Sequence, residues 1–337
     1  MGATGGTPSV TMQDVAARAG VSRALVSIVF RGVSGASAAT RERVFAAAAE
    51  LDYRPDHHAR LLGRKRSRTI GVVFALPQEF HGELVDHLYA TSESTEYDLA
   101  LGAVTPAHDE GNAVRSMVDY RVEALILIGP TLQRARLAEL AARTPTVVVA
   151  RAIRGTPVDV VRTDDVAGAR IAVEHLVSRG HQAIVHVDGG TAAGAAERRR
   201  GYRAAMRGAG LGEAEHIVGG GITDADGEAA GQALLAAKAG CTAVAAFNDH
   251  CAAGLIATMR AAGVRVPGDL SVVGFDNSHI AGLATLALTT IAQDGAALAA
   301  QALDRAIARA DGLAGAPQES LVAPRLVVRG TTSNPLE

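Results

Sequence analysis

The sequence is poor in cysteine and lacks long apolar runs. Its two cysteines, Cys241 and Cys251, lie in apolar, Ala-rich surroundings, so we expect buried free thiols and no disulfide bridge. No run of about 18 or more uncharged apolar residues occurs, which predicts no membrane span. The chain begins with neither a basic start nor an apolar core. We therefore expect residues 1–9 to be a disordered lead-in instead of a signal peptide, and the protein to be cytoplasmic.

The chain also lacks the short motifs of common nucleotide-binding and hydrolytic enzymes. No Gly-x-Gly-x-x-Gly turn opens the first helix of the predicted body. Neither a phosphate-binding Gly-Lys-Ser/Thr nor a Gly-x-Ser-x-Gly elbow occurs. Three histidines, His175, His181 and His186, do not have the spacing of zinc ligands. We predict that the protein is not an enzyme and has no cofactor or metal.

What the chain does have is length, apolar content and an uneven charge. Its 337 residues, 48% of them hydrophobic, are enough for a small head and a two-part body with real cores. Residues 1–68 contain 11 Arg and Lys against 5 Asp and Glu, whereas the remainder contains 22 against 30. A basic head on an acidic body places the attraction for nucleic-acid phosphates at one end of the chain.

The basic head has the pattern of three short helices followed by Pro55. A hydroxyl residue precedes each helix as a cap, and Gly20 permits the sharp turn of a helix-turn-helix. The expected capping residues are Thr11 with Asp14 in a capping box, Ser22 and Ser37. The apolar positions expected to face one another are Val15, Ala16, Ala19, Val26, Val29, Val44, Ala48 and Leu51.

The basic head contains five characteristic segments, residues 11–16 (TMQDVA), 19–22 (AGVS), 26–27 (VS), 40–44 (TRERV) and 53–55 (YRP). With these segments the head resembles the DNA-binding headpiece of the LacI family of bacterial transcription regulators. The combination is far more specific than a generic helix-turn-helix pattern. The alternative is an Ala-rich helical bundle with no role in DNA binding.

In that family the second helix of the motif lies in the major groove, and residues 22–30 match it here. The resemblance implies that Arg23, Ala24 and Ile28 read bases. Arg23 can pair with a guanine edge, with a phosphate contact as the alternative, and Ile28 can pack on a thymine methyl. A polar residue is common at the position of Ile28, so the operator sequence does not transfer from relatives. The other residues expected at the DNA are Thr11, Ser22, Ser27 and Arg31.

Residues 56–62 resemble the hinge helix of the family, a segment too short to be helical alone. The resemblance implies that two hinges fold together over the minor groove, where Leu62 wedges between base pairs and kinks the duplex. An ordinary linker residue is the alternative for Leu62. Ala59 and Arg60 also match the family pattern, and His57 is expected to face phosphates or solvent.

From residue 69 onward, short apolar runs alternate with amphipathic helical stretches, as expected for parallel strands buried on both faces. A helix is predicted over residues 166–179, entered through Asp164 and ended by Gly180. We predict two doubly wound α/β subdomains. The expected strands are residues 69–76, 99–104, 124–128, 146–150, 183–187, 243–247 and 271–275.

The body also resembles that of the LacI family, which is similar in fold to periplasmic sugar-binding proteins. The matching landmarks are residues 164–165, 168, 175–176, 180–181, 200–202, 247–249, 271–276, 288–291 and 293. We expect a helix-turn-helix domain at 10–54, a hinge helix and basic linker at 55–68, and an effector-binding and dimerisation domain at 69–337. Its N-subdomain is expected at about 69–161 and 292–322, and its C-subdomain at about 162–291 and 323–330.

In that fold a small molecule binds in the cleft between the subdomains, at the carboxyl ends of strands. The resemblance implies effector contacts at Asn248, Asp276 and Gln293. Their carboxylate and amide groups suit sugar hydroxyls or a purine edge, with a helix cap as the alternative for Asn248 and Asp276. The other residues expected in this cleft are Phe80, His81, Arg151, Arg198 and Phe275.

Two family contacts are missing from the expected cleft. Ala196 stands where we expect the effector-clamping arginine of many relatives, so Arg198 or a neighbouring residue is expected to replace it. Ala150, followed by Arg151, stands in place of a carboxylate. We predict a dimeric repressor that binds a palindromic operator, with affinity controlled by a sugar or related metabolite. The alternatives are a LacI-type repressor without an effector and, from another class, a soluble sugar-binding protein.

Overall fold

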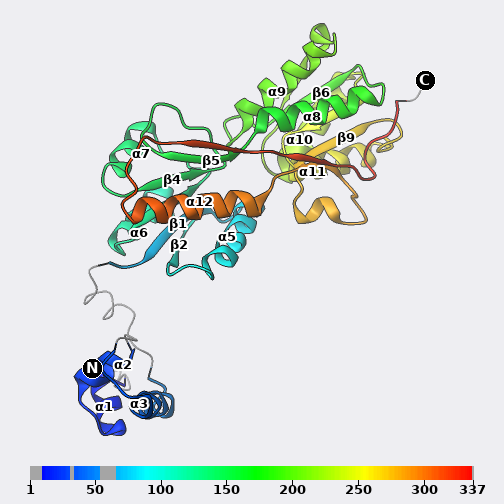
Figure 1. The fold of residues 1–337 in the computed structure, drawn as a ribbon. Coiled ribbons are helices and arrows are strands. Elements are labelled where there is room, and N and C mark those ends of the chain that lie inside the picture. Colours follow the sequence, from blue (N-terminus) through cyan, green and yellow to red (C-terminus); the bar gives the residue numbers. More distant parts are fainter. Residues whose placement is uncertain (1–9, 31–33, 54–65, 336–337) are drawn as a thin grey trace, which may run out of the picture. The chain divides into compact units, whose positions relative to one another are not determined.

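The structure is a computed structural model that describes residues 10–30, 34–53 and 66–335. The chain forms two compact units, Met1–Ser67 and Arg68–Glu337, which are described separately as the head and the body (Figure 1). Within the described ranges, no helix combines the length and the apolar character needed to cross a bilayer.

The head packs α1 (Met12–Ala19), α2 (Arg23–Phe30) and α3 (Ala38–Glu50) around a small apolar core. Thr11 and Asp14 form the predicted capping box, in which the Thr11 N–H donates to Asp14 Oδ2 at 2.8 Å. The buried residues of this core are Val15, Ala16, Ala19, Val26, Val29, Val44, Ala47 and Ala48. The amphipathic pattern of the head is therefore confirmed, with Leu51 only partly buried.

The turn between the first two helices depends on Gly20. Its φ of 66° lies in the left-handed region, which glycine adopts without a steric penalty. Ser22 Oγ then accepts the N–H of Leu25, and Ser37 Oγ accepts the N–H of Thr40 at the start of α3. These contacts confirm the predicted turn and caps of a helix-turn-helix.

The body contains two six-stranded sheets. Across the first sheet the strands are β11 (Glu319–Val322), β5 (Asp159–Thr163), β4 (Thr146–Val149), β3 (Ala124–Ile128), β1 (Thr69–Ala75) and β2 (Asp98–Val104), all parallel. Across the second they are β12 (Arg325–Val327), β10 (Thr289–Ala292), β9 (Ser271–Asp276), β8 (Ala243–Ala246), β6 (Ile184–Asp188) and β7 (His216–Gly219). Only the pair of β10 with β12 is antiparallel.

Helices cover both faces of each sheet (Figure 1). On the first sheet, α5 (Glu79–Ser92) and α12 (Gly295–Ala310) pack on one face, and α6 (Glu110–Asp119) and α7 (Arg134–Ala141) on the other. On the second, α8 (Asp165–Ser178) and α9 (Ala195–Gly208) oppose α10 (Asp224–Ala237) and α11 (Asp249–Ala261). Short 3-10 helices lie at Gly212–Ala214 and His279–Gly282. The predicted fold class is confirmed.

The strand pattern missed β5, β7, β10, β11 and β12. In β5, Asp159 and Arg162 interrupt the apolar run, yet both are buried. Asp159 accepts from Arg309 at 2.7 Å, and Arg162 donates to Glu319 at 2.7 Å, so partners distant in sequence allow charged residues in a buried strand.

The chain passes from one sheet to the other after β5, after β10 and after β11.

The predicted caps of α8 are also present. Asp164 Oδ1 accepts the N–H of Ala167, and Gly180, with φ of 97°, follows the helix. Both cysteines are free thiols. Cys251 is buried, as predicted, whereas Cys241 is only partly buried.

Candidate DNA-binding surface and effector site

Helix α2 exposes one face and buries the other. Arg23 and Ala24 are exposed, while Val26 and Val29 on the opposite side fill the core of the head. The Arg23 guanidinium has no hydrogen bond or ion pair with any described residue. An arginine on an exposed helical face without an internal partner is available to bind an external anion or base edge.

The neighbouring predicted contacts have partners inside the head. The Ser22 hydroxyl oxygen caps α2, and the Thr11 hydroxyl donates to Asp14 Oδ2 at 2.7 Å. Ile28 is half-buried, and the loop at Gly35 lies against its side chain. Ser27 is also half-buried. Five predicted contacts lie outside the described residues, namely Arg31, His57, Ala59, Arg60 and Leu62.

In the body, a buried arginine connects elements at the carboxyl ends of the second sheet. Arg198, on α9, is 5% exposed. Its Nε donates to Asp165 Oδ1 at 2.9 Å and its Nη1 to the Phe247 carbonyl oxygen at 2.6 Å. Its Nη2 lies 3.5 Å from Asp276 Oδ1. The guanidinium thus organises the starts of α8 and α9 and the ends of β8 and β9.

Two aromatic rings enclose this guanidinium. Its Cζ lies 3.5 Å from the ring centroid of Phe275 and 4.6 Å from that of Phe247. A Cβ on Gly168 would lie 2.7 Å from the Phe275 ring, so a side chain there would displace it. The rings supply cation–π attraction and hold the planar group in one orientation.

The structure shows which of the residues around Ala196 reaches the strand ends. Ala196 is exposed on the first turn of α9, so a side chain at position 196 projects from the solvent-exposed face of the helix. Arg198, three residues before Gly201, is the arginine that reaches the carboxyl ends of the strands. The strand ends therefore hold a buried arginine, although Ala196 supplies none.

A polar chain continues from Asp276 toward the first sheet. Gln293 Nε2 donates to Asp276 Oδ1 at 2.8 Å, and the Thr163 hydroxyl, at the end of β5, donates to Gln293 Oε1 at 2.5 Å. Burial raises the pKa of Asp276 to about 6, although Arg198 and Gln293 act in the opposite direction. Asp276 Oδ2 accepts no hydrogen bond from the described residues, so one carboxylate oxygen remains available to a ligand.

Other predicted effector residues have structural partners. Asn248 Oδ1 caps α11 by accepting the Cys251 N–H at 2.8 Å, and its Nδ2 donates to the Ile222 carbonyl. His81 Nδ1 accepts the Ala75 N–H at 3.1 Å, and burial lowers the pKa of His81 to about 4, so the ring is neutral. Phe80 packs partly into the core of the first sheet.

Arg151 connects the two sheets from the loop after β4. Its Nη2 donates to the carbonyl oxygen of Thr191, in the loop before α9, at 3.0 Å. Its Nε is buried and has no partner among the described residues. The residue that follows Ala150 therefore spans the junction between the two halves of the body.

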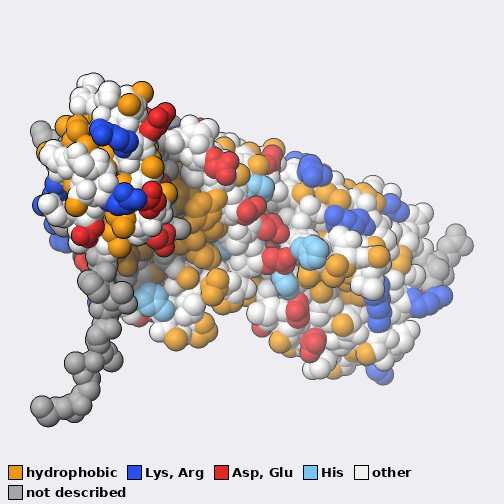
Figure 2. Space-filling model, turned by 90° about the horizontal axis from the view of Figure 1, so that it is seen from below, with side chains coloured by type: hydrophobic (Ala, Val, Ile, Leu, Met, Phe, Trp, Pro, Cys, Tyr) orange, Lys and Arg blue, Asp and Glu red, His pale blue; other side chains and the backbone are white. Residues whose placement is uncertain are grey.

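The sequence pattern did not single out an acidic group at the same junction. Figure 2 shows acidic and histidine side chains gathered near the middle of the body on the face in view. Glu79 and Glu83 share one face of α5, and His250 pairs with Glu79 across the junction. Burial, Glu79 and Asp276 raise the pKa of Glu83 to about 7. The i, i+4 spacing of the two glutamates after the first strand was the available signal.

A second buried carboxylate, that of Asp249, lies next to this site. Asp249 accepts hydrogen bonds from the Ser278 N–H at 2.7 Å and from the Thr290 hydroxyl at 2.5 Å. Burial raises the pKa of Asp249 to about 7, and the charge of Asp276 acts in the same direction. Asp249 ties the start of α11 to β10 and thereby holds the strand ends in register.

The head is a helix-turn-helix with an exposed arginine, and the body has two sheets whose strand ends carry a polar site. This combination defines a DNA-binding regulator with a periplasmic-binding-protein-like body. Residues 11–56 match the model of bacterial regulatory proteins of the lacI family, and residues 173–332 match the periplasmic binding protein-like domain. The chain is 31% identical over 330 residues to the HTH-type transcriptional regulator GalR of Escherichia coli (strain K12), covering 96% of each chain. The chain belongs to the LacI family of transcriptional regulators.

Solved structures agree with this assignment. A LacI transcriptional regulator from a Rhodococcus species is 43% identical and superposes with a TM-score of 0.76, covering 79% of this chain and 98% of that one. The lac repressor dimer bound to operator and the anti-inducer ONPF is 29% identical, with a TM-score of 0.84 and coverage of 96% and 99%. These relatives are DNA-binding regulators and not enzymes.

Proposed function

We propose that this regulator is a repressor that binds a near-palindromic operator as a dimer and responds to a small polyhydroxylated effector. The observation that carries the proposal is the exposed, unpartnered Arg23 on a helix whose opposite face is buried. The lac repressor in the similar structure is a dimer on its operator. A two-fold dimer presents two such helices, which favours a site with two related halves. A repressor acts on chromosomal DNA, so we also propose a cytoplasmic location.

Exposed apolar side chains at one edge of the first sheet support the dimer. Strand β2 ends the strand order of that sheet, and its Leu101 is 39% exposed. Tyr89 on α5 and Tyr120 after α6 are exposed too, and both helices contact β2. A second copy would cover apolar surface and the free edge of β2 together.

On the DNA, we propose that Arg23 pairs with a guanine edge, while Ala24 and Ile28 contact thymine methyl groups. Phosphate contacts are assigned to Thr11, Ser22, Ser27 and His57. Arg31 is assigned to replace part of the base contact that Ile28 lacks. The hinge residues Ala59 and Arg60 would line the minor groove, and Leu62 would wedge into its central base step.

The effector is proposed to lie at the junction of the two halves of the body. Asp276 offers one free carboxylate oxygen, and Arg198 and Gln293 orient it. A carboxylate between an arginine and an amide suits a ligand that both donates and accepts, such as a sugar. The remaining contacts are assigned to Phe80, His81, Arg151, Asn248 and Phe275. Binding there would change the angle between the halves and so the pairing of the hinges.

Selection of duplexes from a random pool by the purified full chain, at near-physiological salt, tests the DNA proposal. Enrichment of a palindrome with a flexible central step is expected. A folded, dimeric protein that enriches no sequence would contradict it. Release of the selected duplex by members of a panel of sugars, nucleosides and sugar phosphates then tests the effector. Asp276→Asn is expected to abolish that release while leaving operator binding intact.

An effector-independent repressor is the second candidate. It is favoured by the internal partners of Arg198, Asn248 and His81, because each side chain is already hydrogen-bonded within the body. A ligand that binds only the folded protein must raise its unfolding temperature. This second candidate predicts that no panel member stabilises the body or releases the operator.

A further inference from the structure

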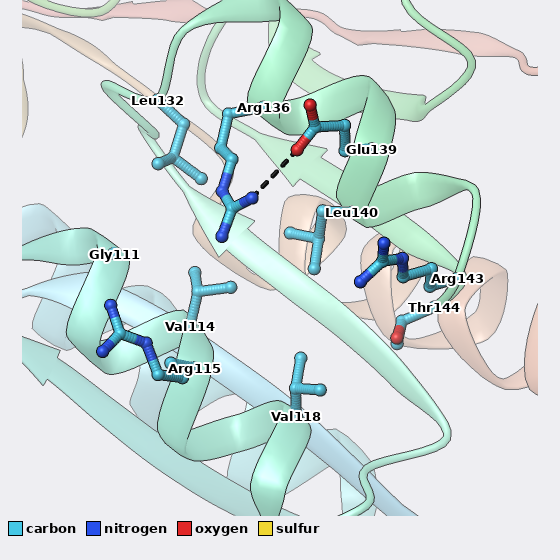
Figure 3. A pocket seen from close by; sticks show the side chains of 10 residues that line it. All are labelled: Gly111, Val114, Arg115, Val118, Leu132, Arg136, Glu139, Leu140, Arg143 and Thr144. Atoms are coloured by element: carbon cyan, nitrogen blue, oxygen red, sulfur yellow. Dashed lines mark hydrogen bonds and ion pairs between the residues drawn. The ribbon is translucent and has the colours of Figure 1, made fainter.

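A pocket lies between α6 and α7, the two helices that cover one face of the first sheet. Its volume is about 300 Å³, at the lower end of the range for small-molecule sites (Figure 3). Its lining comes from those two helices and the residues that flank α7. None of its lining residues belongs to the polar chain around Asp276.

The floor of this pocket is apolar. Val114 and Val118 project from one face of α6, four residues apart, and Leu132 and Leu140 face them from the side of α7 (Figure 3). Val118 is 42% exposed, a large fraction for a valine on a helix that packs on a sheet. A ligand with an apolar body would remove these side chains from water.

The rim of the pocket is cationic. Arg115, Arg136 and Arg143 line it together with a single carboxylate, that of Glu139. Arg136 Nη1 donates to Glu139 Oε2 at 2.9 Å. Arg115 and Arg143 have no ion pair or side-chain hydrogen bond with the described residues, so the lining carries two positive charges without a counter-charge.

We propose that this pocket binds a small amphipathic carboxylate, separate from the effector at the junction. Its apolar body would lie on the floor of valine and leucine, and an arginine of the rim would hold its carboxylate. The two parallel N–H groups of a guanidinium match the two oxygens of a carboxylate. A cationic head group on the same apolar body would meet an excess of positive charge here, and a neutral one would form only uncharged-to-charged hydrogen bonds in place of an ion pair.

Isothermal titration of the full chain with octanoate, octanol and octylammonium tests this, because the three probes share one chain and differ in head-group charge. Octanoate is expected to bind with one-to-one stoichiometry and about tenfold or more tighter than octanol, with octylammonium weakest. The double variant Arg115→Gln/Arg143→Gln should weaken octanoate binding by about tenfold or more and leave octanol binding unchanged. Arg134→Gln, an exposed residue of the same helix α7 that does not line the pocket, is the matched control.

Two further variants control for misfolding and for binding at the other site. Val118→Asp places a carboxylate on the exposed floor and should abolish octanoate binding with the circular dichroism spectrum unchanged. Asp276→Asn should leave octanoate binding unchanged, because that residue lies at the other site. Equal binding of octanoate and octanol, or unchanged binding by the double variant, would overturn the proposal.

Discussion

His250 joins the two halves of the body through Glu79. Its Nε2 lies 2.9 Å from Glu79 Oε2, at the start of α5 on the first sheet. Its Nδ1 lies 2.9 Å from Asp224 Oδ1, at the start of α10 on the second. Partial burial lowers the pKa of His250, but the hydrogen bonds and charges of these carboxylates outweigh it and raise the pKa above its ordinary value.

The His250 contact should make the stability of the body depend on pH. A raised folded-state pKa means that the contribution is fully present below the ordinary histidine value of 6.5 and is lost as pH rises through the folded value. His250→Gln should therefore lower the free energy of unfolding by about 1 kcal/mol or less at pH 5.5, and by less at pH 8.5. Urea unfolding at both pH values measures this difference.

The matched control for this prediction is His108→Gln, because His108 is exposed and has no charged partner among the described residues. This substitution should leave the pH dependence of the free energy of unfolding the same as in the unsubstituted protein. Burial raises the pKa of Glu83 to about 7 and that of Asp276 to about 6, so these groups also contribute to the pH dependence of the unsubstituted protein. The quantity to compare is therefore the change in stability that each substitution causes at each pH. Equal losses at both pH values for His250→Gln would contradict a protonated histidine.

Arg198→Met should destabilise the body strongly. The substitution leaves the buried carboxylate of Asp165 without its partner, and breaking one side of a buried pair costs about 3–5 kcal/mol. Adding Asp165→Asn should restore part of the loss, since the uncompensated charge is removed. Urea midpoints of the two single variants and the double variant measure this coupling. If the free-energy changes of the two single variants simply add in the double variant, the pair does not act as a unit. Arg170→Gln, on the exposed surface of α8, serves as the control.

Arg23→Ala should weaken binding to the selected operator by about tenfold or more and relax the preference for one base pair in each half-site. Arg43→Ala removes the same charge from the exposed surface of α3 and should act on all sequences alike. Binding isotherms on the operator and on random DNA, at several salt concentrations, distinguish the two roles. Uniform losses for Arg23→Ala, with a shallower salt dependence, would identify a phosphate clamp.

Leu62→Ala should reduce binding to the operator far more than binding to random duplexes. The reason is that a wedge contributes only where the central step can be kinked. A competition assay with operator and random DNA measures the ratio. If both affinities fall by the same factor, Leu62 acts as an ordinary linker residue.

The sequence by itself determined the head and the central strands of both sheets, because these features depend on residues close together in the chain. The caps at Thr11 and Ser37 and the left-handed turn at Gly20 involve residues within a few positions of one another, so pattern alone placed the head. The apolar central strands of both sheets were likewise predictable, because strands buried on both faces need uninterrupted apolar runs. The family followed from the same local segments.

Long-range pairing was decided only by the tertiary structure. Strand β5 contains buried charges that are stable only because Arg309 and Glu319, more than a hundred residues away, pair with them. The exposed Ala196 and the buried Arg198 differ by two positions on one helix, and only the packing of α9 shows which of them faces the strand ends. His250 and Glu79 are 171 residues apart. No local pattern encodes such contacts, because they depend on how the two sheets bring distant strand ends to one place.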